Sequence, residues 1–380
     1  MAKVYITGTG AVKIARHYPL GVRDLAFQAG KQALAESGSD NVDFVIVASS
    51  LSYLQAPQLD LASYIASSLG LHGVRALTVE AGESSGLAAL ETAVSLIKSE
   101  EASRILLIGV DKMTEHPSGP TYAMLQALYD TESDAYYNIG HASIAALLMR
   151  LYMEKYEVDR LTLAYWPAMM HMHAKNNPHA MLPFAVAPEK VMTAMPIAEP
   201  ITLLDAYPLG DGAAAIVLEN GDELEGRPLA EIESVVSATG MPSPALRDDP
   251  LDLESLRTAL GRLGGLEKID VIELHDSFSI YGLLELETLG LAEKGESAKL
   301  VAEGYFSTEG EGPLVNPSGG LKARGHPIGA TDVYKLVEVS RILAGTWQGV
   351  QRGDEETGMI VSINAAGSSA RIALLRKVKG

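Results

Sequence analysis

The chain contains no cysteine among its 380 residues. Disulfide bonds, thiolate zinc sites and catalysis by a cysteine nucleophile are therefore excluded, because each of them requires a thiol. Phenylalanine is also scarce, with 5 residues against 15 tyrosines. Most of the aromatic rings in this protein therefore carry a polar group that can take part in hydrogen bonds.

Basic side chains are in the minority. Lys and Arg together number 30 and Asp and Glu 48, so the formal net charge is -18. A protein that binds the phosphate backbone of a nucleic acid needs a basic face. The charge balance therefore disfavours nucleic acid as a partner.

Long apolar runs are missing as well. The longest ones, Ile144–Met149 and Ala213–Leu218, are far shorter than the ~18 residues of a membrane-spanning helix. The first ten residues resemble a strand entering a glycine turn and lack the basic and apolar regions of a secretory signal. We therefore expect no membrane association and a cytoplasmic location.

Short β-branched runs alternate with helix-length segments, which predicts an α/β fold. Because the strands are apolar on both sides, a mainly parallel sheet covered on both faces is expected. In the first half, strands are predicted at Val4–Thr9, Phe44–Ala48, Ala76–Val79 and Ile105–Val110, and helices at Val22–Ser37, Leu59–Leu69 and Ser84–Ser99.

The same alternation restarts after a polar segment at 220–228, which we interpret as a linker. Strands are predicted at Leu229–Ala238, Val271–Leu274, Met359–Ile363 and Arg371–Leu375, and helices at Asp252–Leu263, Ser279–Gly290 and Thr331–Leu343. The repetition predicts two similar halves, residues 1–220 and 229–380.

An irregular stretch at about 112–207 belongs to the first half. It is rich in Tyr, Met, His and Pro, and it has one clear helical pattern, at Ala142–Tyr156. Long loops within compact α/β proteins are usually lids or pocket walls. This stretch is therefore expected to form a loop domain over a pocket.

Four segments carry residue types that packing alone does not select. In the first, Glu83 lies just before the predicted helix Ser84–Ser99, and a helix-capping acid is its simplest interpretation. In the second, His275 and Asp276 follow a strand, at the edge where open α/β sheets bind ligands. Capping of the next helix by Asp276 is an equal alternative for this second segment.

The third segment, Asn316–Ala330, holds four glycines together with Asn316 and His326. Glycine allows close approach of the backbone to a ligand, so a ligand loop is predicted. Its pattern lacks the GK[ST] sequence of a nucleotide-binding P-loop. The fourth segment, Asn364–Ala370, consists of small residues and is either a plain hairpin turn or backbone that approaches a substrate.

Together these segments resemble the thiolase superfamily, and within it the sterol-carrier/lipid-transfer-protein branch. Residues 316–330 match the family signature Asn-Pro-Ser-Gly-Gly…Gly-His-Pro-Ile-Gly-Ala, and His275–Phe278 looks like its His-Asp-x-Phe element. Leu204–Ala215 and Lys175–Pro178 are similar to further family motifs. The resemblance extends over nearly the whole chain.

The resemblance implies a thiolase fold, in which two βαβαβαββ halves form five layers, α-β-α-β-α, with an inserted loop domain. It also implies a CoA thioester as substrate, no tightly bound cofactor, no metal and a homodimer. Related lipid-transfer-type aldolases work with a small OB-fold partner. The implied catalytic residues are Glu83, His275, Asn316 and His326, and the implied substrate- or CoA-binding residues are Ser277, Tyr281, Ser318, Gly319, Gly320 and Gly367.

The chain departs from this family at its nucleophile. With Val79, Glu80, Ser85 and Gly86 aligned, Glu83 takes the position of the cysteine that becomes acylated. Ser277 and the Asn364–Gly367 turn stand where relatives carry a second cysteine. Attack by a carboxylate on a thioester would form a mixed anhydride, so ordinary acyl transfer is not expected.

The remaining groups favour a carbon–carbon bond reaction without a covalent intermediate. By the resemblance, His275 and His326, with Asn316 or an ordered water, surround the thioester oxygen, and preorganised donors there stabilise an enolate. We therefore predict an aldol or retro-aldol reaction with Glu83 or a tyrosine as the base. The candidate tyrosines are Tyr122, Tyr129, Tyr136, Tyr137 and Tyr281.

Three alternatives stay open: an acetyl-CoA acetyltransferase in name only, a decarboxylase, or a non-catalytic acyl-CoA-binding subunit of a larger complex. The charge of Glu83 disfavours decarboxylation, because it would repel a β-carboxylate. An open pocket favours an enzyme. A pocket filled by Glu83 or tyrosine side chains favours the binding subunit.

Overall fold

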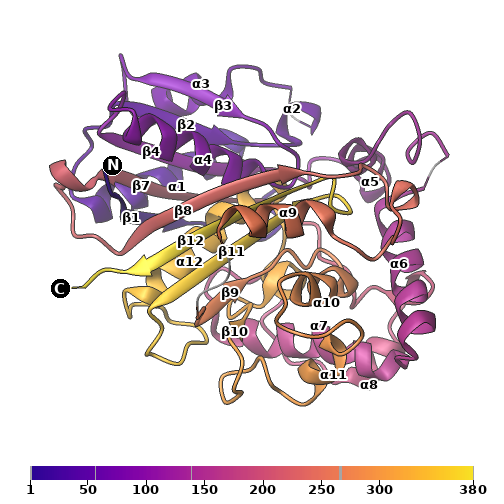
Figure 1. The fold of residues 1–380 in the computed structure, drawn as a ribbon. Coiled ribbons are helices and arrows are strands. Elements are labelled where there is room, and N and C mark those ends of the chain that lie inside the picture. The colour runs from indigo at the N-terminus through magenta and orange to yellow at the C-terminus, as the bar shows by residue number, and fades with distance from the viewer. Residues whose placement is uncertain (1, 56, 138, 265–267, 380) are drawn as a thin grey trace.

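The computed structural model describes residues 2–55, 57–137, 139–264 and 268–379. Over these ranges, ten strands form one sheet in the order β10-β9-β11-β12-β8-β1-β7-β4-β2-β3 (Figure 1). The strands are β1 (Val4–Ala11), β2 (Phe44–Ala48), β3 (Arg75–Val79), β4 (Arg104–Asp111), β7 (Gly212–Asn220), β8 (Ala230–Thr239), β9 (Val271–Glu273), β10 (Leu314–Val315), β11 (Thr357–Asn364) and β12 (Ser369–Lys377).

The two halves of the chain order their strands identically. From the sheet edge to its centre, each half runs third, second, fourth, fifth and first strand in chain order. The two first strands, β1 and β8, pair antiparallel at the centre, with Val4 opposite Ile232. This shared order is the arrangement that two similar halves predict, while the boundaries at residues 220 and 229 stay a prediction.

The sheet is mixed, so the expectation of a mainly parallel sheet was wrong. Strand β2 pairs parallel with β3 and β4, and β9 pairs parallel with β10 and β11. The pairings of β7 with β1 and β4, and of β12 with β8 and β11, are antiparallel. Strands buried on both faces are apolar throughout in either direction, so composition alone does not reveal the direction.

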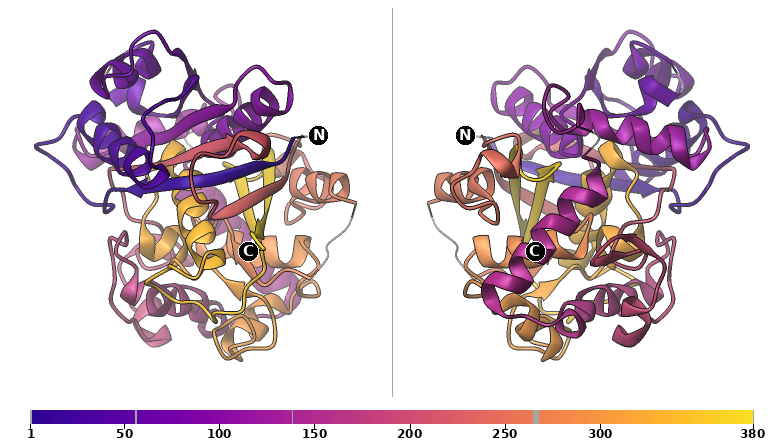
Figure 2. Two further views of the ribbon diagram at one scale, coloured as in Figure 1. Left: turned by 90° about the vertical axis from the view of Figure 1, so that its left-hand side faces the viewer. Right: turned by 90° about the vertical axis from the view of Figure 1, so that its right-hand side faces the viewer.

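Helices lie in three layers around the two halves of the sheet (Figures 1 and 2). Helices α1 (Val22–Ser37) and α3 (Leu61–Ser68) cover the outer face of the first half. Helices α4 (Ser85–Lys98) and α12 (Thr331–Leu343) pack against each other and contact strands of both halves. Helix α9 (Glu254–Arg262) covers the second half. The order of layers is thus α-β-α-β-α, as the resemblance implied.

The insertion at 112–207 is more helical than predicted. It contains α5 (Ser118–Leu125), α6 (His141–Tyr156), α7 (Arg160–His173), α8 (Pro188–Met192) and the short hairpin of β5 (Pro196–Ala198) and β6 (Ile201–Thr202). Helix α7 escaped prediction because Pro167 lies inside it, and proline usually ends a helix. The Asp159 side chain starts this helix by accepting hydrogen bonds from the backbone N–H groups of Leu161 and Thr162.

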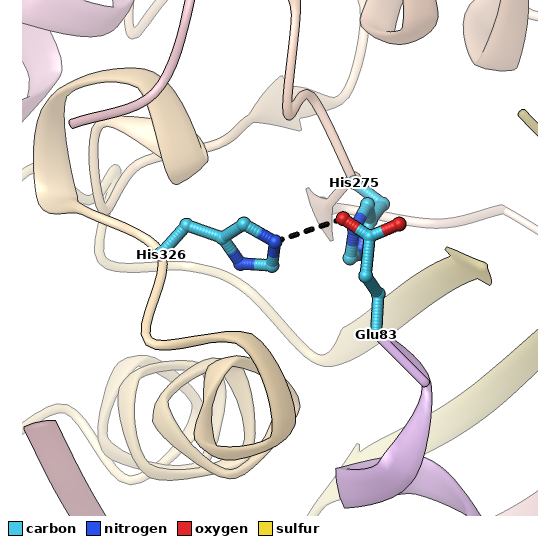
Figure 3. Close-up of side chains that lie close together, drawn as sticks. All are labelled: Glu83, His275 and His326. Atoms are coloured by element: carbon cyan, nitrogen blue, oxygen red, sulfur yellow. Dashed lines mark hydrogen bonds and ion pairs between the residues drawn. The ribbon is translucent and has the colours of Figure 1, made fainter. Parts of the chain in front are cut away.

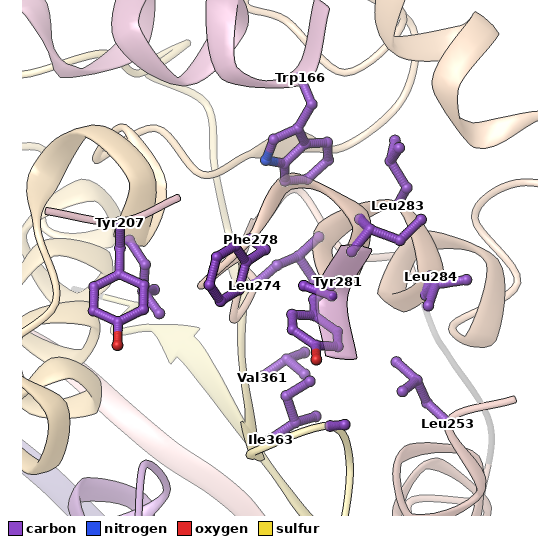
Figure 4. Close-up of a cluster of buried hydrophobic side chains, with 14 of the residues drawn as sticks. Trp166, Tyr207, Leu253, Leu274, Phe278, Tyr281, Leu283, Leu284, Val361 and Ile363 are labelled. Carbon is purple, nitrogen blue, oxygen red and sulfur yellow. The ribbon is translucent and has the colours of Figure 1, made fainter. Parts of the chain in front are cut away.

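The insertion packs on the second half of the chain. Helix α7 contacts α10 (Ser279–Thr288) and α11 (Ser297–Ala302), and the magenta and orange ribbons lie side by side in Figures 1 and 2. The core between them includes Trp166, Leu274 and Leu283, all fully buried (Figure 4). Burial of such side chains contributes about 1.5–3 kcal/mol each. The first half therefore supplies a segment of the second half's core.

One short helix, α2 (Ser52–Gln55), completes the α-helices of the described residues. No helix in the described ranges is both long enough and apolar enough to cross a lipid bilayer.

Candidate active site

Glu83 immediately precedes Ser84, the N-cap residue of α4, and its side chain is fully buried. Its backbone N–H donates to Asn364 Oδ1 at 3.0 Å, and its Oε2 accepts from the Ala365 N–H at 2.6 Å. Both partners lie at the turn between β11 and β12. The interpretation of Glu83 as a helix-capping acid was therefore wrong, because the side chain is bound by the other half of the molecule.

Imidazole rings surround the second carboxylate oxygen of Glu83 (Figure 3). His326 Nε2 lies 3.0 Å from Oε1 in a hydrogen bond, and His275 Nε2 lies 3.6 Å from the same atom. His275 follows β9, and His326 lies in the loop before α12. The structure thus brings Glu83, His275 and His326 together, as the sequence motifs predicted.

A third histidine joins this cluster without having been predicted. His141 Nε2 lies 3.9 Å from Glu83 Oε1, and the residue is the first of α6 in the insertion. Its ring is buried, and it packs against Phe278 with ring centroids 4.9 Å apart. The one local signal is its place next to Gly140 in a His- and Tyr-rich insertion, and it lies outside the four family motifs named above.

Helix α12 orients the two predicted histidines. His326 Nδ1 is 2.6 Å from Thr331 Oγ1, and His275 Nδ1 is 3.4 Å from Lys335 Nζ. Lys335 also donates to the Val361 carbonyl at 2.7 Å and lies 3.3 Å from Asp332 Oδ1. Thr331 and Lys335 of α12 therefore hold the Nδ1 side of the two rings, and the Nε2 atoms face Glu83.

Burial dominates the ionisation of the cluster. It raises the pKa of Glu83 to about 8, although the Ala365 N–H acts in the opposite direction. The same loss of water lowers the pKa of His275 and of His326 well below the usual imidazole value, and that of His141 to about 3. Charge is therefore costly at every member of the cluster unless an opposite charge compensates for it.

Tyrosines close the cluster on the side of the insertion. Tyr129, Tyr207 and Tyr281 are buried, and burial together with the charge of Glu83 raises the pKa of all three phenols. The Tyr207 ring meets His326 edge-on with centroids 4.7 Å apart, and Tyr129 meets His141 at 5.2 Å. Tyr207 was not among the predicted candidates.

The other predicted tyrosines lie elsewhere. Tyr136 and Tyr137 are 76% and 73% exposed, and their rings meet edge to face. Tyr122 is half-exposed and lines the cavity described below. Of the five candidate tyrosines, Tyr129 and Tyr281 are the buried ones, and the charge of Glu83 acts on the pKa of both.

The Asn316 side chain forms a hydrogen bond with the backbone next to His275. Its Oδ1 accepts from the Leu274 N–H at 2.6 Å, and its Nδ2 lies 3.5 Å from Met170 Sδ. The bond to Leu274 holds the residue just before His275. Asn316 therefore positions His275, and its expected place beside a thioester oxygen stays a prediction.

Four of the residues predicted to bind CoA have structural roles within the fold itself. Ser318 Oγ donates to Glu273 Oε2 at 2.8 Å, and a Cβ on Gly319 would meet Ala174 Cβ at 2.4 Å. Gly320 and Gly367 adopt positive φ angles of 58° and 98°. Internal packing explains all four residues. Their contact with CoA, like that of Tyr281 and the buried Ser277, stays a prediction.

A cavity of about 630 Å³ lies beside the cluster. This volume is typical of a small-molecule site. Its wall is mainly apolar and includes Leu125, Met195, Ile197 and Leu203 from the insertion. His141, Tyr207 and Phe278 belong both to this wall and to the surroundings of Glu83.

Two family patterns cover most of the chain. Residues 4–222 match the thiolase N-terminal domain, and residues 254–377 match the thiolase C-terminal domain-like family. This chain belongs to the thiolase family. The acetyl-CoA acetyltransferase of Methanothermobacter thermautotrophicus is 33% identical over 386 residues, covering 99% of this chain and 100% of that protein.

Further relatives define the branch. Sterol carrier protein 2 of Bos taurus is 30% identical, and the match covers 90% of this chain and 66% of that protein. The chain belongs to this sterol-carrier-protein-2-type branch of the family. The solved structure of the Ltp2-ChsH2(DUF35) aldolase has a TM-score of 0.84 at 20% identity, covering 100% of this chain and 99% of that one. At this identity, the likeness establishes the common fold.

Proposed function

We propose that this thiolase-family protein makes or breaks the bond between the α and β carbons of a β-hydroxyacyl-CoA thioester by an aldol or retro-aldol reaction. The observation that carries the proposal is the position of Glu83. This fully buried carboxylate, which the resemblance aligns with the family's nucleophile, has His326 at 3.0 Å and His275 at 3.6 Å. Polar groups converge here, yet no thiol is available to form an acyl-enzyme.

The proposed reaction balances without a further reactant. In the cleavage direction, the β-hydroxyl group gives its proton to a base, and the bond between the α and β carbons breaks. The electron pair of that bond forms the enolate of the thioester, and the α carbon then takes up a proton. The products are an aldehyde or ketone and a shortened acyl-CoA.

The two predicted histidines suit the enolate. Neutral imidazole N–H groups that face a developing oxyanion in a dry site stabilise it strongly, often by a few kcal/mol each. His275 and His326 are held by Lys335 and Thr331, so little reorganisation is needed. The proton is carried by Glu83 or by one of the tyrosines around it. Tyr207 is the tyrosine that also borders the cavity.

A second candidate, an acyl-CoA-binding subunit without catalysis, is favoured by the closure of the site. Glu83, His275 and His326 have no exposed surface. His141 and Tyr207 line the cavity and also contact Glu83 and His326, so a substrate in the cavity would approach the cluster past these side chains. A protein that binds acyl-CoA without cleaving it would keep this cluster permanently closed.

The proposal also covers the oligomeric state, the partner protein, the location and the substrate. Strand β3 ends the sheet, and Leu77 on it is 42% exposed, so this edge suits pairing with a second copy in a homodimer. A small OB-fold partner and a cytoplasmic location are proposed from the resemblance alone. The acyl-CoA substrate is proposed from the family and from the cavity beside Glu83.

A screen of β-hydroxyacyl-CoA thioesters tests the proposal. Purified protein, with and without co-purified partners, is incubated with each thioester, and released aldehyde or ketone is measured together with the shortened acyl-CoA. Equal amounts of the two products are expected, and Glu83→Gln is expected to lower kcat by about 100-fold or more. Binding of the thioesters without release of either product would favour the second candidate.

A further inference from the structure

Lys335 is a fully buried lysine of α12, and its ammonium group stands behind the ring of His275. Its Nζ lies 3.4 Å from His275 Nδ1, the ring nitrogen opposite the one that faces Glu83. We propose that Lys335 is a positioning residue that keeps the single ring proton of His275 on Nε2. His275 is thereby fixed as a hydrogen-bond donor toward the centre of the site and is excluded as its base.

The contacts of the Lys335 ammonium leave His275 Nδ1 only the role of an acceptor. Nζ donates to the Val361 carbonyl at 2.7 Å and lies 3.3 Å from Asp332 Oδ1. An ammonium group has three N–H donors and no acceptor, so its third N–H is available to Nδ1. A ring nitrogen that accepts a hydrogen bond carries no proton, and a neutral imidazole then holds its proton on the other nitrogen.

The surroundings of His275 also keep its ring neutral. Burial lowers the pKa of His275 well below the usual imidazole value, and the charge of Lys335 acts in the same direction. A doubly protonated ring would place an N–H against the ammonium, which is unfavourable in a site without water. The ring therefore holds one proton, and the ammonium decides which nitrogen carries it.

The two histidines of the site are unequal at their Nε2 atoms (Figure 3). His326 Nε2 is in a hydrogen bond with Glu83 Oε1 at 3.0 Å. His275 Nε2 lies 3.6 Å from the same oxygen and, within the described part of the chain, is buried without a hydrogen-bond partner. Buried polar atoms are nearly always paired, so a free N–H at this place suits an oxygen atom of a ligand.

The place of His275 in the fold does not depend on Lys335. The His275 backbone N–H donates to Glu285 Oε2 at 2.8 Å, and the preceding Leu274 N–H donates to Asn316 Oδ1 at 2.6 Å. These bonds hold the backbone when the ammonium is removed. Loss of the ammonium should therefore change the location of the ring proton more than the location of the ring.

The sign of the charge behind an imidazole determines what the ring can do. A carboxylate at Nδ1, as in the serine hydrolases, holds the proton on that nitrogen and leaves Nε2 free to act as a base. An ammonium group at Nδ1 has the opposite effect. In the proposed reaction, His275 then donates to the enolate oxygen, and the proton of the β-hydroxyl group is left to Glu83 or a tyrosine. Only this last step rests on the proposed function.

Magnetic resonance of the ring nitrogens tests the proton position without any activity assay. Full-length protein is labelled with ¹⁵N-histidine, and long-range proton–nitrogen spectra distinguish a protonated from an unprotonated ring nitrogen. The signals of His275 are assigned by their loss in His275→Gln. We expect a protonated Nε2 and an unprotonated Nδ1 in the wild type. A proton on Nδ1, or on both nitrogens, would overturn the proposal.

Lys335→Met tests whether the ammonium sets the proton position, because methionine keeps the length of the side chain without the charge or the N–H donors. The His275 signals of this variant should show the form protonated on Nδ1. Lys299→Met, at a lysine of α11 whose side chain is 64% exposed, is the matched control and should give the wild-type signals. Wild-type His275 signals in Lys335→Met would refute the role of Lys335.

Chemical rescue separates the ammonium from the rest of the side chain. Because the chain has no cysteine, Lys335→Cys can be alkylated by 2-bromoethylamine at this position alone, in denaturant and before refolding. The product carries an ammonium group on a side chain as long as that of lysine. It should restore the wild-type signals of His275, and failure of the refolded protein to do so would contradict the proposal. If Lys335→Met does not fold, the wild-type spectrum still decides.

Kinetic measurements extend the test to the proposed reaction. Lys335→Met should lower kcat for β-hydroxyacyl-CoA cleavage by about 10–100-fold with little change in KM, because the donor acts on charge that develops in the transition state. If the ring proton follows Lys335 but no thioester is cleaved, the role of Lys335 stands and the proposed function falls. If Lys335→Met cleaves at the wild-type rate, the function stands and the importance of Lys335 for it falls.

Discussion

The Glu83 carboxylate accepts a hydrogen bond from the Ala365 N–H at 2.6 Å, across 282 positions of the chain. Glu83 lies at the start of α4 in the first half, and Ala365 lies in the β11–β12 turn of the second. His275 and His326, also from the second half, approach the same carboxylate. The site therefore exists only where the two halves meet.

Thiolysis should be absent. The chain has no cysteine, and the resemblance to the thiolases aligns Glu83 with their nucleophile, so purified protein should not cleave acetoacetyl-CoA in the presence of CoA. The measurement follows the consumption of acetoacetyl-CoA, with an authentic thiolase as positive control. Robust turnover would refute the nucleophile argument.

Glu83→Cys should fold. The change removes the acceptor of the Ala365 N–H, which costs about 1–3 kcal/mol, but it also removes a buried carboxyl group whose pKa burial has raised. Circular dichroism and thermal unfolding check the fold, with Glu83→Ala as the matched variant. Thiolase activity that appears in Glu83→Cys but not in Glu83→Ala would show that the remaining pocket is competent for acyl transfer. Failure of Glu83→Cys to fold would contradict the prediction.

Tyr207→Phe should slow the proposed reaction. Loss of a hydroxyl group that handles a proton typically costs about 10²–10⁴-fold in rate. Tyr136→Phe is the control, because Tyr136 is 76% exposed and contacts Tyr137. The initial rate of β-hydroxyacyl-CoA cleavage is measured for both variants. Equal rates for Tyr207→Phe and wild type would remove Tyr207 from the mechanism.

Gly82→Ala should destabilise the junction between the halves. Gly82 has a φ of +59°, and an added Cβ would lie 1.9 Å from Asn364 Oδ1, the acceptor for the Glu83 N–H. We expect a loss of about 2 kcal/mol or more in the free energy of unfolding, measured with urea. Gly261→Ala, in helix α9 with open space around it, should be neutral or stabilising by up to about 1 kcal/mol. Equal stability of both variants would contradict the role of Gly82.

Local patterns in the sequence determined the elements of this protein. The predicted bounds of α1, β2 and α12 agree with the structure, because apolar periodicity and the residues at element ends are local properties. Resemblance to the thiolases placed Glu83, His275 and His326 in one site, since their motifs are short and specific. Helix α7 was missed because Pro167 breaks the local pattern, although packing against α10 and α11 holds that helix.

Tertiary structure alone decided the direction of the strands and the completion of the site. Strand β7 runs antiparallel to β4, and the whole insertion lies between them in the chain, so neither a short turn nor the composition reveals that direction. His141 and Tyr207 lie in this insertion, and only its packing on the second half brings His141 to Glu83 and Tyr207 to His326. Asn316, a motif residue, proved to hold the Leu274 backbone. A motif states which residues occur together, whereas the contacts of each atom depend on parts of the chain that lie far apart in sequence.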